Sequence, residues 1–174
     1  MRTKSNRIRR VCVAACAAPL LVLTGAAGAG AAAATTPTGA APLARPGVAE
    51  QSSASEILTL VNEERGKANC PALKENSKLT QAAQTHANDM AAHHLTGHTG
   101  SDGSNEETRL DRVDYKWRSW GENVSGPGYN SAKAHVDGWL GSAKHKATML
   151  NCSYTETGVG TSGDYAVQMF GIPQ

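Results

Sequence analysis

The spacing of apolar residues changes along the chain and divides it into a helical part and a β-rich part. One stripe has the three- and four-residue spacing of a helix face, and it begins just after Asn76 and Ser77. Its members are Leu79, Ala82, Ala83, His86, Ala87, Met90 and Ala91. Because alanine side chains are small, we expect this helix to pack closely against a sheet or a second helix.

Three further helices are predicted. The stretch SASE places Glu56 three residues after Ser53, which is the pattern of a capping box, so a helix is expected from Ser53 until Gly66 stops it. Another is expected from about Ser131 to Leu140, and a short one from Lys146 to Leu150.

The C-terminal part has the pattern of β-strands. The segments TGVGTS and YAVQMFG are separated by Ser162, Gly163 and Asp164, which predicts a hairpin with Gly163 in the turn. A third strand is expected from Trp120 to Val124. Helices followed by a terminal hairpin indicate an α+β domain with an antiparallel sheet.

The N-terminal region has the composition of a targeting segment. Five basic residues precede an apolar run from Val11 to Leu23, and small residues follow up to Ala34, which is the pattern of a secretory signal peptide over residues 1–34. Residues 35–52 hold three prolines and little that could form a core, so a flexible linker is expected there. The folded domain is then expected over residues 53–174 of a secreted, extracellular protein without a transmembrane anchor.

Removal of the signal peptide reverses the sign of the net charge. All 15 Asp and Glu residues follow residue 34, whereas five of the 17 Lys and Arg residues precede it, so the mature chain carries −3. This charge gives no reason to expect a nucleic-acid partner.

The cysteine count indicates one disulfide. Cys12 and Cys16 leave with the signal peptide, and Cys70 and Cys152 remain as an even pair in an oxidising compartment. A metal site built from two isolated cysteines is the weaker alternative. If both thiols are paired, neither serves as a catalytic nucleophile.

Candidate chemistry rests on histidines and one acid. The sequence has no G-x-S-x-G, no H-E-x-x-H, no phosphate-binding glycine loop and no dinucleotide fingerprint. His86 and His135 lie on apolar helix faces, where a hydrogen-bonded core histidine is expected. His98 and His145 are each expected in a polar loop, directly after a helix or between helical segments, and are candidates for a metal or catalytic site. The loop of His98 is the Gly- and Ser-rich stretch at residues 95–108.

Glu122 is the acid that fits these histidines. It lies between glycines in WGENVSG, where a buried carboxylate would need partners. It could accept a hydrogen bond from an imidazole N–H and fix its tautomer, or bind a metal itself. The alternative is a carboxylate held by backbone amides.

Four segments together resemble one known family. LTGHTGSDGS, WGENVSG, GWLGSAKHKATMLNCSYTETGVG and YAVQMFG occur in the order and roughly the spacing of the CAP superfamily. That superfamily includes cysteine-rich secretory proteins, antigen 5 and pathogenesis-related 1 proteins. The similarity covers about residues 55–172 and is strongest to short secreted bacterial CAP domains.

The resemblance implies a fold and a site. The fold would be an α-β-α sandwich with a central antiparallel sheet, and a large cleft would be lined by two histidines and two acids. His98 and His145 match the histidines and Glu122 the first acid; Ser142 stands where the second acid is expected, and Glu156 matches a separate segment. The cleft therefore resembles a tetrad reduced to three.

The residues and the resemblance together favour two functions. Two imidazoles and a carboxylate suit zinc or another divalent cation. The first hypothesis is a secreted, monomeric, non-enzymatic module that binds a lipid, a sterol or a protein, with His98, Glu122 and His145 as a metal site. The second is a metal-assisted, peptidase-like hydrolase that uses the same residues.

Overall fold

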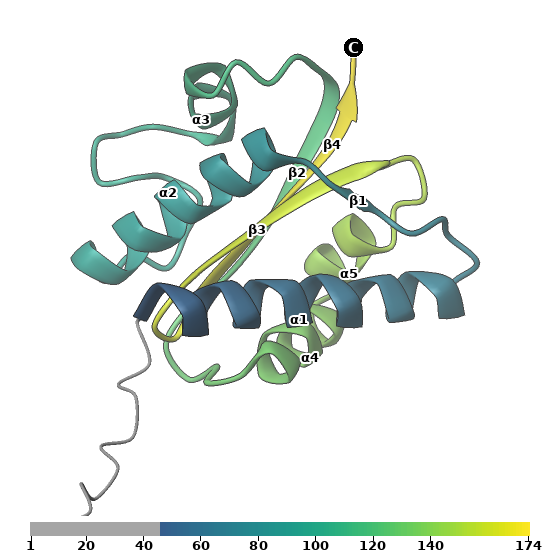
Figure 1. The fold of residues 1–174 in the computed structure, drawn as a ribbon, viewed down its shortest axis with the longest axis horizontal. Coiled ribbons are helices and arrows are strands. Elements are labelled where there is room, and N and C mark those ends of the chain that lie inside the picture. The colour runs from purple at the N-terminus through teal and green to yellow at the C-terminus, as the bar shows by residue number, and fades with distance from the viewer. Residues whose placement is uncertain (1–45) are drawn as a thin grey trace, which may run out of the picture. The chain divides into compact units, whose positions relative to one another are not determined.

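The computed structural model describes the backbone of residues 46–174 and the side chains from Ser53 onward. The expected signal peptide and residues 35–45 of the expected linker lie outside the described residues. The described part contains five helices and four strands in the order α1, β1, α2, α3, β2, α4, α5, β3 and β4 (Figure 1).

The first two helices are the longest. α1 (Pro46–Lys67) begins at Pro46, so residues 46–52 are helical and the predicted start at Ser53 is wrong. Proline is well suited to the first position of a helix because the N–H that it lacks would have no partner there. α2 (Ser77–His93) begins where it was predicted, and the side chain of Asn76 caps it by accepting a hydrogen bond from the N–H of Lys78.

The remaining helices are short. α3 (Glu106–Arg112) was not predicted, and it starts inside the stretch that was expected to be a loop. α4 (Ala132–Gly141) confirms the helix predicted after Ser131. α5 (Ala143–Met149) begins earlier than expected, so His145 lies within a helix and not in a polar loop.

The sheet has the strand order β1-β3-β4-β2. The predicted hairpin is confirmed: β3 (Glu156–Ser162) and β4 (Tyr165–Pro173) are antiparallel, and Gly163 in their turn has a positive φ of 56°. β2 (Trp117–Ser125) pairs antiparallel with β4 on its other side. β1 (Lys74–Glu75) pairs parallel with β3, which makes the sheet mixed and not wholly antiparallel.

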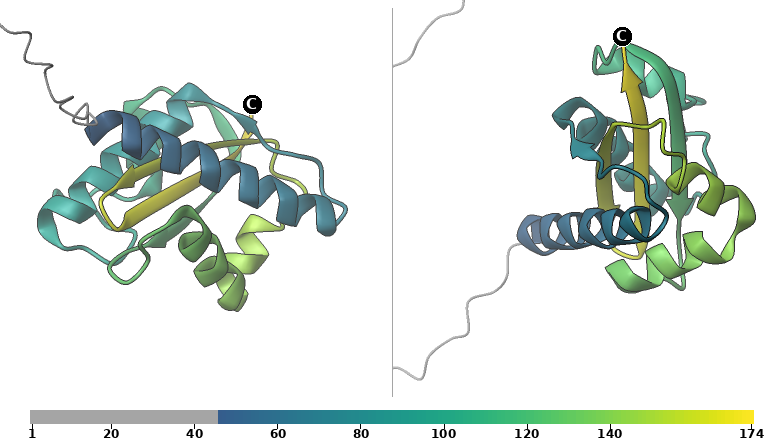
Figure 2. Two further views of the ribbon diagram at one scale, coloured as in Figure 1. Left: turned by 60° about the horizontal axis from the view of Figure 1, so that its bottom comes forward. Right: turned by 90° about the vertical axis from the view of Figure 1, so that its right-hand side faces the viewer.

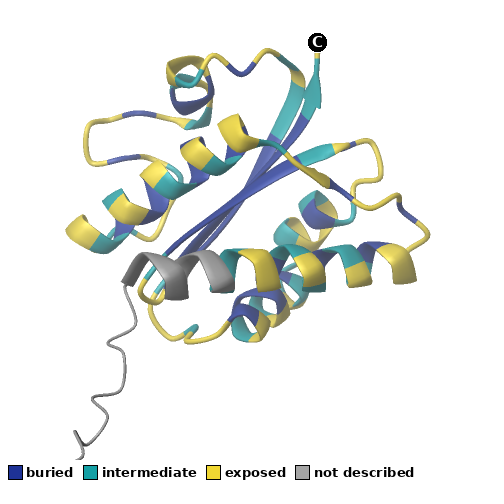
Figure 3. Ribbon diagram, viewed as in Figure 1, coloured by how far each residue is buried: buried dark blue, intermediate teal, exposed yellow. Residues whose placement is uncertain are grey.

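Helices cover both faces of the sheet, as the α-β-α expectation required (Figure 2). One apolar cluster joins α1, α4 and α5 to Ala166 and Phe170 of β4. The other joins α2 and α3 to Val167 and Met169 of the same strand. Because successive strand residues point to opposite faces, β4 contributes to both clusters, and its central part is buried throughout (Figure 3).

The alanine-rich helix lies very close to the sheet. A methyl group added at Gly158 would come within 2.0 Å of the backbone nitrogen of Thr80, and one added at Gly160 within 2.3 Å of the backbone of Gln84. Two glycines of β3 therefore permit the close approach of α2 that its small side chains predicted.

The predicted disulfide between Cys70 and Cys152 is present. Beside it, the wholly buried Arg65 donates hydrogen bonds to four backbone carbonyls. These belong to Pro71, Met149, Asn151 and Tyr154. Burial lowers the pKa of Arg65. The disulfide and this guanidinium together hold the end of α5, the helix that carries His145.

We predict that Gly158→Ala destabilises the protein by about 1–3 kcal/mol, because the backbone of α2 must move away from the sheet. The measurement is urea-induced unfolding of both proteins. Gly66→Ala is the matched control: nothing lies within 4 Å of its added methyl group, and alanine is the better residue in a helix, so its stability should not fall.

We predict that Cys70→Ala/Cys152→Ala lowers the free energy of unfolding by up to about 4 kcal/mol, because the open chain regains the entropy of a long loop. The two cysteines are 82 positions apart in sequence. Calorimetry of the variant and of reduced wild type should give matching losses. An unchanged melting temperature in both would show that the bond does not stabilise the fold.

Candidate functional site

His98 and Glu122, predicted to belong to one site, are in direct contact. His98 lies in the segment between α2 and α3, and Glu122 lies in the middle of β2. The His98 Nδ1 atom is 2.7 Å from Oε1 of Glu122. Since a carboxylate accepts and does not donate, Nδ1 carries the proton and Glu122 sets the tautomer, which is the first of the two roles foreseen for this acid.

Glu122 is buried, and a buried arginine neutralises its charge. The Glu122 side chain is 1% exposed and that of Arg109 is 2% exposed, and Nη2 of Arg109 lies 2.8 Å from Oε2 of Glu122. The Nη1 atom of the same guanidinium donates to the backbone oxygens of His98 and Ser104. Arg109 thus holds both the acid and the main chain of the histidine.

A second acid stands beside His98, and it is not where the sequence placed it. The Glu106 Oε1 atom lies 3.5 Å from Nδ1 of His98, and Glu106 comes from the unpredicted helix α3. Ser142 caps α5, where its hydroxyl accepts from the N–H of His145. The expectation of a site with a single acid was therefore wrong.

His98, Glu106 and Glu122 form the three-residue group, here called the His98 cluster, whose ligand atoms all lie within 4.8 Å of one another. His145 is outside this group. Its backbone oxygen accepts a hydrogen bond of 3.0 Å from Asn123 of β2, the residue after Glu122. The strand that carries the acid therefore also positions the helix of the second histidine.

The two histidines have opposite electrostatic environments. The hydrogen bond to Glu122 raises the pKa of His98 above its ordinary value, although partial burial opposes this. Burial, followed by the positive charges of His98 and Lys144, lowers the pKa of His145.

The other residues considered in the sequence, His86, His135 and Glu156, form hydrogen bonds outside the His98 cluster. His86 is 1% exposed and its Nε2 atom lies 3.0 Å from the backbone oxygen of Gly97. His135 is 4% exposed and contacts the hydroxyl of Ser125 at 2.6 Å. Both are core histidines, as predicted. Glu156 accepts hydrogen bonds from Tyr115 and Asn76, which agrees with its exclusion from the candidate site.

The residues of the His98 cluster suit a divalent cation. An imidazole and two carboxylates are ligand types that zinc accepts. The His98 side chain is 32% exposed, so an ion can reach the ring from solvent. With His98 neutral, the two acids exceed the charge of Arg109 by one negative unit, which also favours a cation.

The family model for the cysteine-rich secretory protein family, CAP, matches residues 58–170. The chain belongs to this family. A curated relative, the uncharacterized membrane protein YlbC of Bacillus subtilis, is 30% identical over 121 residues. That similarity covers 70% of this chain and only 35% of YlbC, so the CAP chain spans about a third of its relative.

Solved structures show the same CAP fold. An extracellular protein with an SCP domain from Bacillus anthracis aligns with a TM-score of 0.71 and 25% identity over 77% of this chain and 45% of that one. An outer surface protein of Borrelia burgdorferi aligns with a TM-score of 0.65 and 21% identity over 71% of this chain and 95% of that one. Among residues 46–174 of the CAP chain, no helix has the length and apolar character needed to cross a membrane.

We predict that His98 stabilises the metal-free CAP domain more in acid than in base. Its folded pKa is raised above the unfolded value of about 6.5, so the contribution is complete below that pH and is lost as the pH rises through the folded pKa. Urea unfolding with a chelator, from pH 5.5 to 8.5, should show the stability difference between wild type and His98→Gln shrinking with rising pH.

We predict the opposite pH dependence of stability for His145→Gln in the same urea-unfolding experiments. The folded pKa of His145 is lowered, so wild type should lose stability relative to this variant as the pH falls through about 6.5. Parallel pH dependences for the two variants would contradict the electrostatic account of the site.

Proposed function

We propose that this protein is a secreted, non-enzymatic binding module whose His98 cluster holds a divalent cation, with zinc as the first choice. One observation carries the proposal of a metal: the carboxylates of Glu106 and Glu122 both approach the imidazole of His98, with one atom of each residue within 4.8 Å of the others. Like charges are costly to hold together, and a cation removes that cost.

The tautomer of His98 indicates which nitrogen takes the metal. Because Nδ1 donates to Glu122, the neutral ring has its free lone pair on Nε2. A carboxylate that orients a metal-binding imidazole in this way raises the basicity of the ligand. His145, whose backbone oxygen is bonded by the residue after Glu122, is proposed as the second imidazole of the site. When bound, the cation would supply positive charge to attract a polar or anionic group of a partner.

Secretion is supported by three independent features. The leader has the pattern of a signal peptide. Cys70 and Cys152 form a disulfide, which persists in oxidising compartments. The structural neighbours from Bacillus anthracis and Borrelia burgdorferi are described as extracellular and as an outer surface protein.

Binding without turnover is the simpler function for this site. Family membership does not by itself specify a reaction, because a fold hosts many functions. No observation on residues 46–174 favours the hydrolase alternative. The partner is proposed to be a lipid, a sterol or a protein, and its recognition is expected to involve the exposed side of the His98 cluster.

We predict that the purified mature protein binds about one zinc ion and that His98→Ala weakens binding at least about 100-fold, because the imidazole is a direct ligand. Isothermal titration calorimetry and total metal analysis give the affinity and the stoichiometry. Glu156→Gln is the matched control, since Glu156 bonds Tyr115 and Asn76 and should leave the affinity unchanged. Wild type without zinc affinity, or His98→Ala with full affinity, would refute the proposed site.

The same titration with Glu122→Gln tests the orienting role of the acid. Glutamine can still accept from Nδ1 of His98, so a loss of about 10- to 100-fold is expected and not abolition. Abolished binding would indicate that Glu122 coordinates the metal directly. A peptide library provides the test of the hydrolase alternative. If wild type cleaves it and His98→Ala does not, the protein is a hydrolase and the proposal of a non-enzymatic module is wrong.

A further inference from the structure

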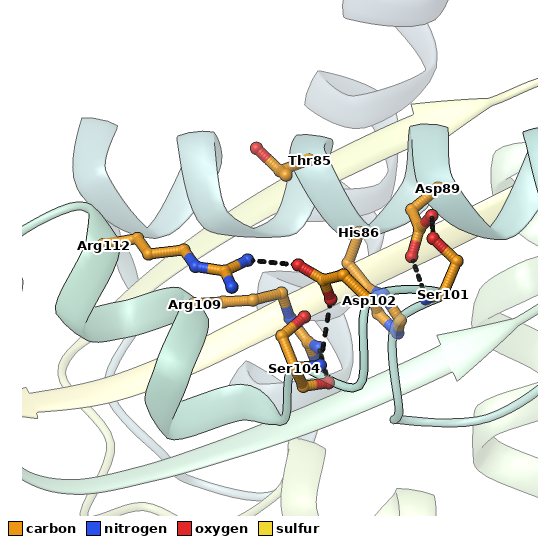
Figure 4. Close-up of a pocket in the computed structure, with 8 residues that line it drawn as sticks. All are labelled: Thr85, His86, Asp89, Ser101, Asp102, Ser104, Arg109 and Arg112. Atoms are coloured by element: carbon orange, nitrogen blue, oxygen red, sulfur yellow. Dashed lines mark hydrogen bonds and ion pairs between the residues drawn. The ribbon is translucent and has the colours of Figure 1, made fainter.

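A cavity of about 170 Å³ lies between α2 and the segment that leads to α3 (Figure 4). Its walls include His86 and Asp89 of α2, Ser101 and Asp102 of the connecting segment, and Arg109 of α3. This volume is ample for an ordered water molecule. It is too small for a ligand of drug size.

Two buried polar atoms of residues that line this cavity have no hydrogen-bond partner among the described residues. They are Nδ1 of His86 and Nε of Arg109. His86 is 1% exposed and Arg109 is 3% exposed, so bulk solvent does not satisfy them. A buried polar group without a partner is destabilising, so an occupant that pairs with both atoms would be favourable.

The hydrogen bonds already formed determine what that occupant must be. Nε2 of His86 faces the backbone oxygen of Gly97 at 3.0 Å, and a carbonyl can only accept, so Nε2 carries the proton and Nδ1 is an acceptor. Arg109 Nε–H is a donor. The occupant must accept from one atom and donate to the other, as water does.

Charge at the cavity excludes simple ions as the occupant. Asp89 and Asp102 are matched by Arg109 and Arg112 among the lining residues. Asp102 is paired with Arg112, and Asp89 accepts from Ser101. A cation would be repelled by the guanidinium of Arg109, and an anion without a proton could not donate to Nδ1 of His86. A neutral molecule with one donor and one acceptor fits both atoms.

These residues connect directly to the candidate site. His86 forms a hydrogen bond with the backbone oxygen of Gly97. Arg109 donates to the backbone oxygen of the next residue, His98, at 3.0 Å. The same Arg109 holds Glu122. His86 of α2 and Arg109 of α3 therefore form hydrogen bonds with the carbonyls of two consecutive residues, the second of which is His98.

We propose that the cavity binds an ordered water molecule that bridges Arg109 Nε–H and His86 Nδ1, and that His86 is thereby a positioning residue for His98 and Glu122. The Nε2 atom of His86 bonds the carbonyl oxygen of Gly97, the residue before His98. The Nδ1 atom acts through the water on Arg109, which bonds Glu122. Among the described residues, no hydrogen bond joins its side chain directly to a residue of the His98 cluster. The metal part of its role rests on the proposed function.

The first test concerns the water and needs no metal. Long-range ¹H–¹⁵N spectra of the metal-free protein should show His86 protonated at Nε2 only, with Nδ1 shifted as a hydrogen-bond acceptor. A crystal structure at high resolution should show a water within about 3.2 Å of both His86 Nδ1 and Arg109 Nε. A proton on Nδ1, or a cavity without density between the two atoms, would overturn the proposal.

The second test separates positioning from stability. His86→Phe removes both contacts, and His86→Gln can still donate to Gly97 while it lacks the acceptor at Nδ1. The matched control is His135→Phe, which removes another buried histidine that bonds Ser125. The readouts are the ring resonances of His98 without metal, the Co²⁺ absorption spectrum and the Zn²⁺ affinity, each beside the melting temperature.

We expect both His86 variants to shift the His98 resonances. His86→Phe should also lower the Zn²⁺ affinity about tenfold and alter the Co²⁺ spectrum, whereas His135→Phe should change only the melting temperature. His86→Gln should fall between wild type and His86→Phe. Unmoved His98 resonances in folded His86→Gln would overturn the proposal. If wild type binds no metal, the proposed function fails, and the metal-free resonances still decide the role of His86.

Discussion

The buried ion pair between Arg109 and Glu122 is the interaction on which the candidate site depends. A carboxylate with 1% of its side chain exposed cannot remain charged without a partner, and the guanidinium at 2.8 Å supplies one. Removing one member of such a pair leaves an uncompensated buried charge, which typically costs about 3–5 kcal/mol. Because Arg109 also bonds the backbone of His98, the same charge holds the histidine against the acid.

The strand that carries Glu122 is supported by contacts elsewhere in the fold. β2 is an edge strand, yet it is held on both sides. β4 pairs with it in register, with Glu122 opposite Met169, while Trp139 and Tyr154 donate hydrogen bonds to the backbone oxygens of Val124 and Trp120. Edge strands without such cover are prone to pair with other chains. Two backbone oxygens of the strand that supports the site are thus bonded by side chains from outside the sheet.

Relatives of this chain share its architecture at low sequence identity. The solved structures from Bacillus anthracis and Borrelia burgdorferi keep the fold at 25% and 21% identity. A fold that persists under so much substitution positions side chains without dictating their chemistry. The function of this CAP domain therefore has to be argued from the charges and hydrogen bonds around His98, and these join three separate segments of the chain.

The features that depend on local sequence were predicted well. The stripe from Leu79 to Ala91 and the turn at Gly163 each need only neighbouring residues, and both are present. The cysteine pair and the contact of His98 with Glu122 were also anticipated, the first because only two mature cysteines remain and the second from the family motifs. The start of α1 was missed although Pro46 is a recognised first residue of a helix.

The sequence by itself determined the periodic elements, the disulfide and the contact of His98 with Glu122. Only the tertiary structure decided the second acid, the neutralising arginine and the polar cavity that this arginine lines. α3 is seven residues long and lacks a clear apolar stripe, so neither Glu106 nor Arg109 had a local signal. Their roles arise because folding removes water from Glu122, and a charge that has lost its water must find its partners among side chains that are distant along the chain.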